Sequence, residues 1–223
     1  FLNIPFSDFS DAWFQILYIV SLISMILGST AAINQKNIKR LLAYSSIANI
    51  GFVLIGILTA NVIGIKSVQL YLSIYMINIL GIFTCILCLK KKKNIYLENI
   101  NDFSGLLKRN SFLSFSFAIL IFSLAGLPPL SGFFGKLYIL IAAVESKLYF
   151  LAIVGILTSI ISAFYYLKII KIIFFDTPTS DTIDINISSI SKLIILATII
   201  ISIFMIIFLS KFLEIINTTS VIS

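Results

Sequence analysis

The sequence contains no histidine, and its only two cysteines, Cys85 and Cys88, lie three residues apart in an apolar run. Zinc, haem and iron–sulfur centres are built from larger sets of His and Cys ligands. We therefore expect this chain to bind no metal and no redox cofactor. Both cysteines are predicted to be free, buried thiols.

Charge is also scarce. Only 11% of the 223 residues are charged and 60% are hydrophobic, whereas about a quarter of the residues of a soluble domain are charged. The chain has no dinucleotide fingerprint and no nucleophile elbow, and Gly132–Lys136 fails as a P-loop because Leu137 stands where Ser or Thr belongs. We therefore expect neither a soluble-type active site nor catalytic chemistry of the chain's own.

What the chain does contain is long apolar runs. Each reaches the ~20 residues that one membrane crossing needs, and backbone polar groups in lipid must be satisfied within a helix. We predict an all-α, polytopic membrane protein with a single membrane domain, 1–223. Its six segments lie at about 12–33, 41–60, 67–89, 111–144, 148–175 and 190–210.

The basic residues are distributed unevenly over the connecting loops. If the helices alternate in direction, one face carries twelve of the sixteen Lys and Arg residues and the other carries three, which is the positive-inside pattern and places both termini outside. Membrane topology therefore explains the net charge of +7 without a nucleic-acid partner. The richer face holds Lys36, Lys39, Arg40, Lys90, Lys91, Lys92, Lys93, Lys108, Arg109, Lys168, Lys171 and Lys192; the other holds Lys66, Lys147 and Lys211.

The segment 111–144 is too long for one straight crossing. As a continuous helix its 34 residues would span about 51 Å, against a hydrocarbon core of ~30 Å. Pro128 and Pro129 lack N–H groups and clash with the preceding turn, so we predict a break near 126–131, with Ser131 as the N-cap of the second half. Carbonyls freed at membrane depth must face a polar interior.

Lys136 follows this break closely. An ammonium inside a bilayer is costly and is usually functional, so Lys136 is a candidate proton-relay residue; the alternative is a lysine that snorkels to the interface. Tyr71, Tyr75 and Asn78 share one helical face. They either line a polar interior or serve as interhelical glue.

Other polar side chains lie on neighbouring segments. Tyr44, Ser45, Ser46 and Asn49 form a polar stretch of the second segment. Tyr165 and Tyr166, near the inner end of the fifth segment, are predicted to belong to an interfacial aromatic belt.

Two stretches resemble signatures of the antiporter-like membrane subunits of respiratory complex I. They are Gln35–Ile47 (QKNIKRLLAYSSI) and Ser123–Lys136 (SLAGLPPLSGFFGK). With Asp102–Leu106 and Ser162–Lys168 beside them, the likeness is greatest to the subunit N branch, which is called NADH dehydrogenase subunit 2 in mitochondria. It covers about Trp13 to Phe175.

The resemblance implies a site. Lys136 would be the proton-relay lysine of the second broken helix and Lys39 a second basic relay site, with Tyr44, Ser45 and Tyr71 as candidate polar neighbours. Asn49 stands where relatives often have His. Because Asn does not titrate, a proton path through that position is in doubt.

The resemblance also implies a function, which is a non-redox, proton-translocating subunit in the membrane arm of NADH:ubiquinone oxidoreductase. NADH, FMN, iron–sulfur clusters and quinone are expected in other subunits. Two alternatives stay open: a structural arm subunit that carries no protons, or a subunit of a cation/proton antiporter. The expected location is the mitochondrial inner membrane, with both termini in the intermembrane space and membrane lipids around the bundle.

The family's first inverted repeat has no counterpart in this sequence, which resembles the second repeat plus a C-terminal helix. A separate chain is therefore predicted to supply the N-terminal half. The alternative is that the sequence is the C-terminal part of an intact subunit.

Overall fold

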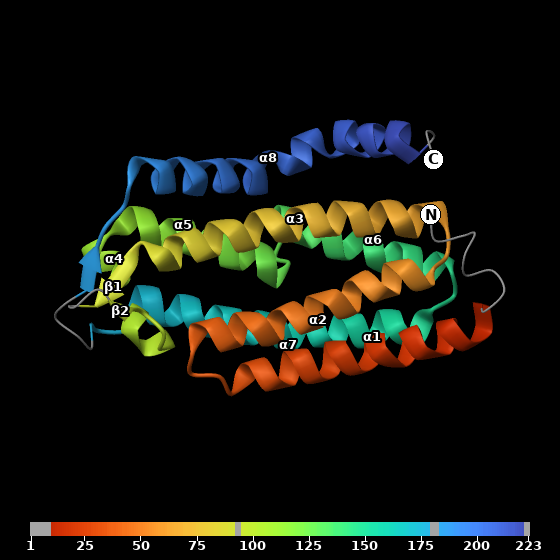
Figure 1. Cartoon of the computed structure of the whole chain (residues 1–223), viewed down its shortest axis with the longest axis horizontal. Helices are drawn as coiled ribbons and strands as arrows, with labels where there is room; N and C mark the ends of the chain where they lie inside the picture. Colours follow the sequence, from red (N-terminus) through yellow and green to blue (C-terminus); the bar gives the residue numbers. More distant parts are fainter. Residues whose placement is uncertain (1–9, 92–94, 179–182, 221–223) are drawn as a thin grey trace.

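The computed structural model describes residues 10–91, 95–178 and 183–220. Seven longer helices run along the long axis of the molecule (Figure 1). They are α1 (Ser10–Ile33), α2 (Ile38–Leu58), α3 (Val62–Leu87), α5 (Ser111–Ala125), α6 (Ser131–Glu145), α7 (Tyr149–Phe175) and α8 (Ser189–Ser220). The shorter elements are β1 (Leu89–Lys91), β2 (Ile95–Tyr96), the 3-10 helix η2 (Ile100–Phe103), α4 (Leu106–Arg109) and β3 (Ile183–Ile185).

The all-α membrane fold expected from the sequence is confirmed. Within the described residues, α1, α2, α3 and α7 are each long and apolar enough to cross a membrane, and α5 and the first part of α8 are shorter apolar helices. In Figure 1, α5 occupies one half of the bundle and α6 the other, with the predicted break between them.

Asparagines fix where several helices begin. The Oδ1 atom of Asn37 accepts hydrogen bonds from the backbone N–H groups of Lys39 and Arg40, at 2.9 and 3.2 Å. Asn61 caps α3 by accepting from Gly64 N at 2.7 Å, and Asn110 caps α5 in the same way. Because Asn61 satisfies orphan donors of the first turn, α3 begins at Val62, about five residues before the hydropathy pattern predicts.

A small sheet of order β2-β1-β3 closes one end of the bundle, in a region predicted to be loop. Its strands pair antiparallel, with Leu89 opposite Ile185 and Lys90 opposite Tyr96. Asn186 N also donates to Cys88 O at 3.0 Å. The sheet therefore ties the end of α3 to the chain entering α8.

The connections gather at opposite ends of the bundle as the charge count requires. The α1–α2 connection, the sheet, α4 and the end of α7 share one end, which we call the basic end, and the α2–α3 and α6–α7 connections share the other (Figure 1). Lys92 and Lys93, and the side chains of Lys91 and Lys211, lie outside the described residues.

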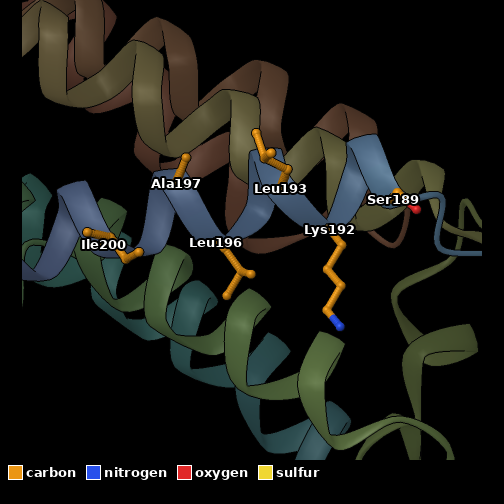
Figure 2. A pocket seen from close by; sticks show the side chains of 6 residues that line it. All are labelled: Ser189, Lys192, Leu193, Leu196, Ala197 and Ile200. Carbon is orange, nitrogen blue, oxygen red and sulfur yellow. The ribbon is translucent and has the colours of Figure 1, made fainter.

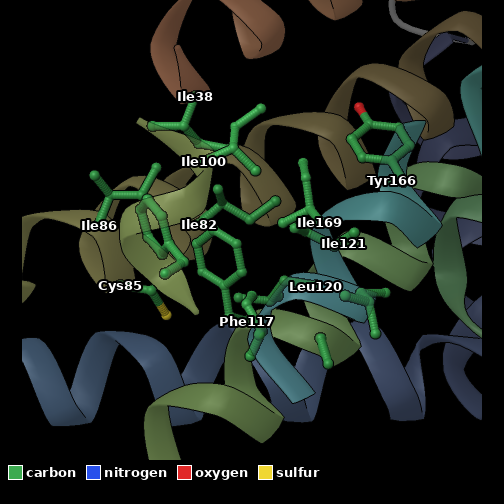
Figure 3. Close-up of a cluster of buried hydrophobic side chains, with 14 of the residues drawn as sticks. Ile38, Ile82, Cys85, Ile86, Ile100, Phe117, Leu120, Ile121, Tyr166 and Ile169 are labelled. Atoms are coloured by element: carbon green, nitrogen blue, oxygen red, sulfur yellow. The ribbon is translucent and has the colours of Figure 1, made fainter. Parts of the chain in front are cut away.

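The described residues form three buried apolar clusters, and part of the largest is shown in Figure 3. Its members include Ile82, Cys85, Phe117, Tyr166 and Ile169, and η2 contributes a further side chain, Ile100. Both cysteines are free and buried. They pack as small apolar side chains.

Helices α1 and α2 lie unusually close. A Cβ atom added at Gly28 would lie 2.5 Å from Ala48 N, so no larger residue fits between the two backbones. Ser21 Oγ donates to Gly51 O at 2.8 Å across the same interface. Small residues and interhelical hydrogen bonds drive this kind of packing in membranes.

Candidate functional site

The break between α5 and α6 is a Schellman-type helix ending followed by a proline turn. Gly126 has φ of 80°, in the left-handed region that favours glycine. Gly126 N donates to Ser123 O and Leu127 N donates to Phe122 O, at 3.0 and 3.1 Å, which is the bonding pattern of that motif. The prolines at 128 and 129 then prevent the helix from continuing.

Ser131 does not cap α6 as predicted. The N-cap position is Leu130, which forms no side-chain cap, and Ser131 is already helical. Its hydroxyl instead lies 3.2 Å from both Ser123 Oγ and Ser202 Oγ. The polar contacts of Ser131 therefore join α5, α6 and α8.

Gly132 lets the two half-helices meet. A Cβ atom built there would lie 1.8 Å from Ser123 O, which is far inside van der Waals contact. Gly132 N instead donates to Ser123 Oγ at 3.1 Å. The start of α6 is thereby bonded to the last turns of α5.

Lys136 lies inside the bundle next to the break. Its side chain is 6% exposed, and Nζ donates to Ala125 O, a carbonyl that the break has freed, at 3.3 Å. Nζ also lies 5.5 Å from the centre of the Phe52 ring, within the range of a cation–π contact. A snorkelling lysine would have an exposed ammonium, and the structure shows a buried one.

The polar face of α3 lies beside this lysine. A small cavity has room for about one water molecule, and on one side of it Asn78 Nδ2 donates to Ser123 Oγ at 2.9 Å. The helical face that carries Tyr71, Tyr75 and Asn78 therefore lines the interior of the bundle and also forms an interhelical hydrogen bond. The two roles expected from the sequence, a polar lining and interhelical glue, are compatible. The lining residues are Tyr71, Ile74, Tyr75, Asn78, Ser123, Leu124, Gly132 and Lys136.

A second run of hydrogen bonds leads away from the cavity. Tyr71 OH donates to Asn49 Oδ1 at 2.9 Å, and Asn49 Nδ2 donates to Ser45 Oγ at 3.5 Å. Ser45 Oγ in turn forms a hydrogen bond with Tyr166 OH. Ser45 and Tyr71, both predicted from the sequence, thus belong to one interhelical chain that we call the Tyr71–Tyr166 chain.

The aromatic-belt prediction for Tyr165 and Tyr166 is wrong. Each side chain is 1% exposed, and their rings pack together with centroids 4.6 Å apart. Sequence reasoning also missed Ser123 and Ser202, and it gave Ser131 only a capping role. Their signal was a hydroxyl within an apolar helix, which is weak because such a hydroxyl commonly bonds only to its own helix backbone.

Lys39 and Tyr44 are not brought to this site. Lys39 is 46% exposed and forms an ion pair with Glu98, with 3.0 Å between Nζ and Oε1. This neighbouring ammonium holds the pKa of the Glu98 carboxyl below its usual range. Tyr44 is 36% exposed on the outside of α2. A relay role for Lys39 stays a prediction.

A larger groove lies elsewhere, along α8 (Figure 2). It has a volume of about 420 Å³ and its polar side chains are Ser189 and Lys192. Its other lining residues are Leu193, Leu196, Ala197 and Ile200. This outward-facing apolar surface offers no buried titratable group and does not compete with Lys136 as a proton site.

Two relatives identified by sequence are much longer than this chain. NADH-quinone oxidoreductase subunit N of Pelagibacter ubique is 52% identical over 176 residues, covering 79% of this chain and 37% of that protein. The subunit N of Rhodospirillum rubrum is 45% identical over 194 residues, covering 87% of this chain and 39% of that protein. The chain thus spans well under half the length of these relatives.

Solved structures also match this chain. A chain of respiratory complex I from Thermus thermophilus with bound aureothin matches with a TM-score of 0.78 and 26% identity, over 90% of this chain and 45% of that one. A chain of the Mrp complex from Dietzia sp. DQ12-45-1b matches with a TM-score of 0.81 and 22% identity, over 96% and 47%, which shows the fold alone. The family described as NADH:quinone oxidoreductase/Mrp antiporter, transmembrane, matches residues 1–162, and this chain belongs to that family.

Proposed function

We propose that this chain is part of a membrane-arm subunit of proton-pumping NADH:quinone oxidoreductase, or complex I, and forms part of a proton path coupled to quinone reduction elsewhere in the assembly. The relatives named subunit N support this assignment. The observation that carries the proton path is Lys136, a buried ammonium beside a helix break. Buried ionisable groups at membrane depth mark ion and proton pathways.

In this proposal Lys136 is the group that gains and loses the proton. The carbonyl of Ala125 and the ring of Phe52 stabilise its charged form. The Tyr71–Tyr166 chain leads from the cavity toward the basic end, because Ser45 and Tyr166 lie in the halves of α2 and α7 nearer that end. Asn49 sits in the middle of this chain and cannot titrate. It can only orient its hydroxyl neighbours.

The experiment is a Lys136→Met variant in the intact complex, reconstituted in vesicles, with protons moved per electron as the readout. Loss of the ammonium should lower this ratio while the assembled complex still oxidises NADH. Lys171→Met, at an exposed position of α7, is the matched control and should leave the ratio unchanged. An unchanged ratio in Lys136→Met would reject the relay and leave a structural role.

The finer features of the assignment are part of the same proposal. The chain carries no redox chemistry, and NADH, FMN, iron–sulfur clusters and quinone bind to other subunits. A separate polypeptide supplies the N-terminal half of the subunit. The complex lies in the mitochondrial inner membrane, with the basic end toward the matrix and both termini toward the intermembrane space. Mass spectrometry of the purified complex tests the partner, and protease protection in sealed mitochondria tests the orientation.

A cation/proton antiporter is a second candidate, because the description of the matching family also names Mrp antiporters. Co-purification decides between the two. Recovery with quinone-reducing subunits supports the complex I assignment, whereas recovery with Mrp-type subunits alone would replace it.

A further inference from the structure

The Asn78 side chain has an unused acceptor beside the candidate proton site. It is 0% exposed on α3, and its Nδ2 atom donates to Ser123 Oγ. Its Oδ1 atom has no hydrogen-bond partner among the described residues. Buried amide oxygens are rarely left without a donor, so this atom indicates that a further donor belongs there.

Lys136 has donors to spare. An ammonium carries three N–H groups, and the side-chain hydrogen bond that the structure gives it goes to Ala125 O, at a long 3.3 Å. Asn78 and Lys136 line the same cavity. An unused acceptor and a cation with unused donors therefore belong to two residues that line one small space.

The size of that space matches a single water molecule. Its volume, counted as positions open to the centre of a water, is about 10 Å³, near the lower limit for one water. Its polar lining also includes Tyr71, Tyr75 and Ser123. A buried water typically forms about three hydrogen bonds, and this lining can supply them.

We propose that the cavity is a binding site for one ordered water molecule, which accepts a hydrogen bond from Lys136 Nζ and donates one to Asn78 Oδ1. Asn78 is then a positioning residue for Lys136, acting through this water. The inference deepens the proposed function and rests on it. It also extends the hydrogen-bonded surroundings of Lys136 to Asn78, Ser123, Ser131 and Ser202.

Two measurements on the intact complex test this site. The first is a cryo-EM map that resolves buried waters elsewhere in the membrane arm. We expect a density peak within hydrogen-bond distance of both Nζ of Lys136 and Oδ1 of Asn78. A map with other buried waters and no peak here would overturn the water site, even if Lys136→Met still lowers the proton ratio.

The second measurement compares two variants. Asn78→Leu keeps much of the side-chain volume but removes both the water acceptor and the bond to Ser123, whereas Ser123→Ala removes that bond and keeps the acceptor. We expect loss of the water peak and a lower proton-to-electron ratio in Asn78→Leu, with the peak retained and a smaller change in Ser123→Ala. Equal effects of the two variants would show that Asn78 acts only as interhelical glue. If Asn78→Leu does not assemble, the wild-type map alone decides the water site.

Discussion

At the scale of single residues, several polar side chains inside the bundle matter because they form hydrogen bonds between two helices. The sequence places Tyr71 on the inner face of its helix, and the structure shows its hydroxyl donating to Asn49 on α2. One interhelical hydrogen bond in a membrane protein contributes about 0.6 kcal/mol on average and about 1.7 kcal/mol at most. That range sets the expected cost of losing one such bond.

Tyr71→Phe should therefore lower the free energy of unfolding by about 0.6 to 1.7 kcal/mol, because it leaves Asn49 Oδ1 without this donor. The measurement is unfolding of the purified subunit assembly in mild detergent. Tyr149→Phe is the control, since Tyr149 is an exposed residue at the start of α7, and it should be neutral. Equal effects of both changes would contradict the assigned bond.

The Lys39–Glu98 pair belongs to the surface of the basic end. Lys39 lowers the pKa of Glu98, so the contact stabilises the folded state above the unfolded pKa of about 4.3 and loses this contribution as the pH falls through the lower, folded value. Backbone N–H groups at residues 36–40 should exchange with deuterium faster as the pH falls through that window, after correction for intrinsic exchange. Glu98→Gln should abolish this pH dependence, and Asp176→Asn should retain it.

The sequence placed Lys136 beside the break, and the structure shows its side chain buried there, while its relay role stays a prediction; the belt placement of Tyr165 and Tyr166 was wrong. A lysine in a long apolar segment beside two prolines has few stable placements, because lipid does not solvate an ammonium or a free carbonyl. A tyrosine near a helix end is stable either at the interface or inside, provided that its hydroxyl finds a partner. The partner of Tyr166 is Ser45, 121 positions earlier. A prediction made from one segment at a time cannot identify a partner so far away in the sequence.

At the scale of elements, the break between α5 and α6 was predicted because the residues that end the helix, Gly126, Pro128 and Pro129, are neighbours in the sequence. The strands β1 and β3 were missed because each has three residues and their pairing joins segments about ninety positions apart. The early start of α3 was missed because an asparagine cap, rather than hydropathy, fixes it. The helix break could thus be predicted from neighbouring residues, whereas the pairing of distant strands could not.

Gly132→Ala tests the contact between the half-helices. The added methyl group would meet the backbone of Ser123, which cannot rotate away, so we expect a cost of about 1 to 3 kcal/mol and less assembled complex. Gly155→Ala is the control, because its nearest neighbours are side-chain atoms of Leu140 and Phe52 at 3.3 Å. If both variants assemble equally, the half-helices are less closely packed than described.

At the scale of the whole molecule, the bundle has one basic end, and among the residues with described burial Lys136 is the one buried cation. The charge count predicted the basic end without any structural information. This prediction needs only the knowledge of which loops share an end of the bundle. The alternating direction of the helices determines that. The chain nevertheless spans only 37% and 39% of two subunit N relatives. The activity of the whole assembly is therefore tested in the complete complex.

The Tyr71–Tyr166 chain has an evolutionary consequence. Its four members come from α2, α3 and α7, and each forms a hydrogen bond with the next in the order Tyr71, Asn49, Ser45 and Tyr166. A substitution at one position leaves its neighbour with an unpaired polar atom, so these four positions should co-vary among relatives. Homologues with histidine at position 49 should differ at 45, 71 or 166 more often than homologues with asparagine do. Independent variation would mean that each bond is dispensable.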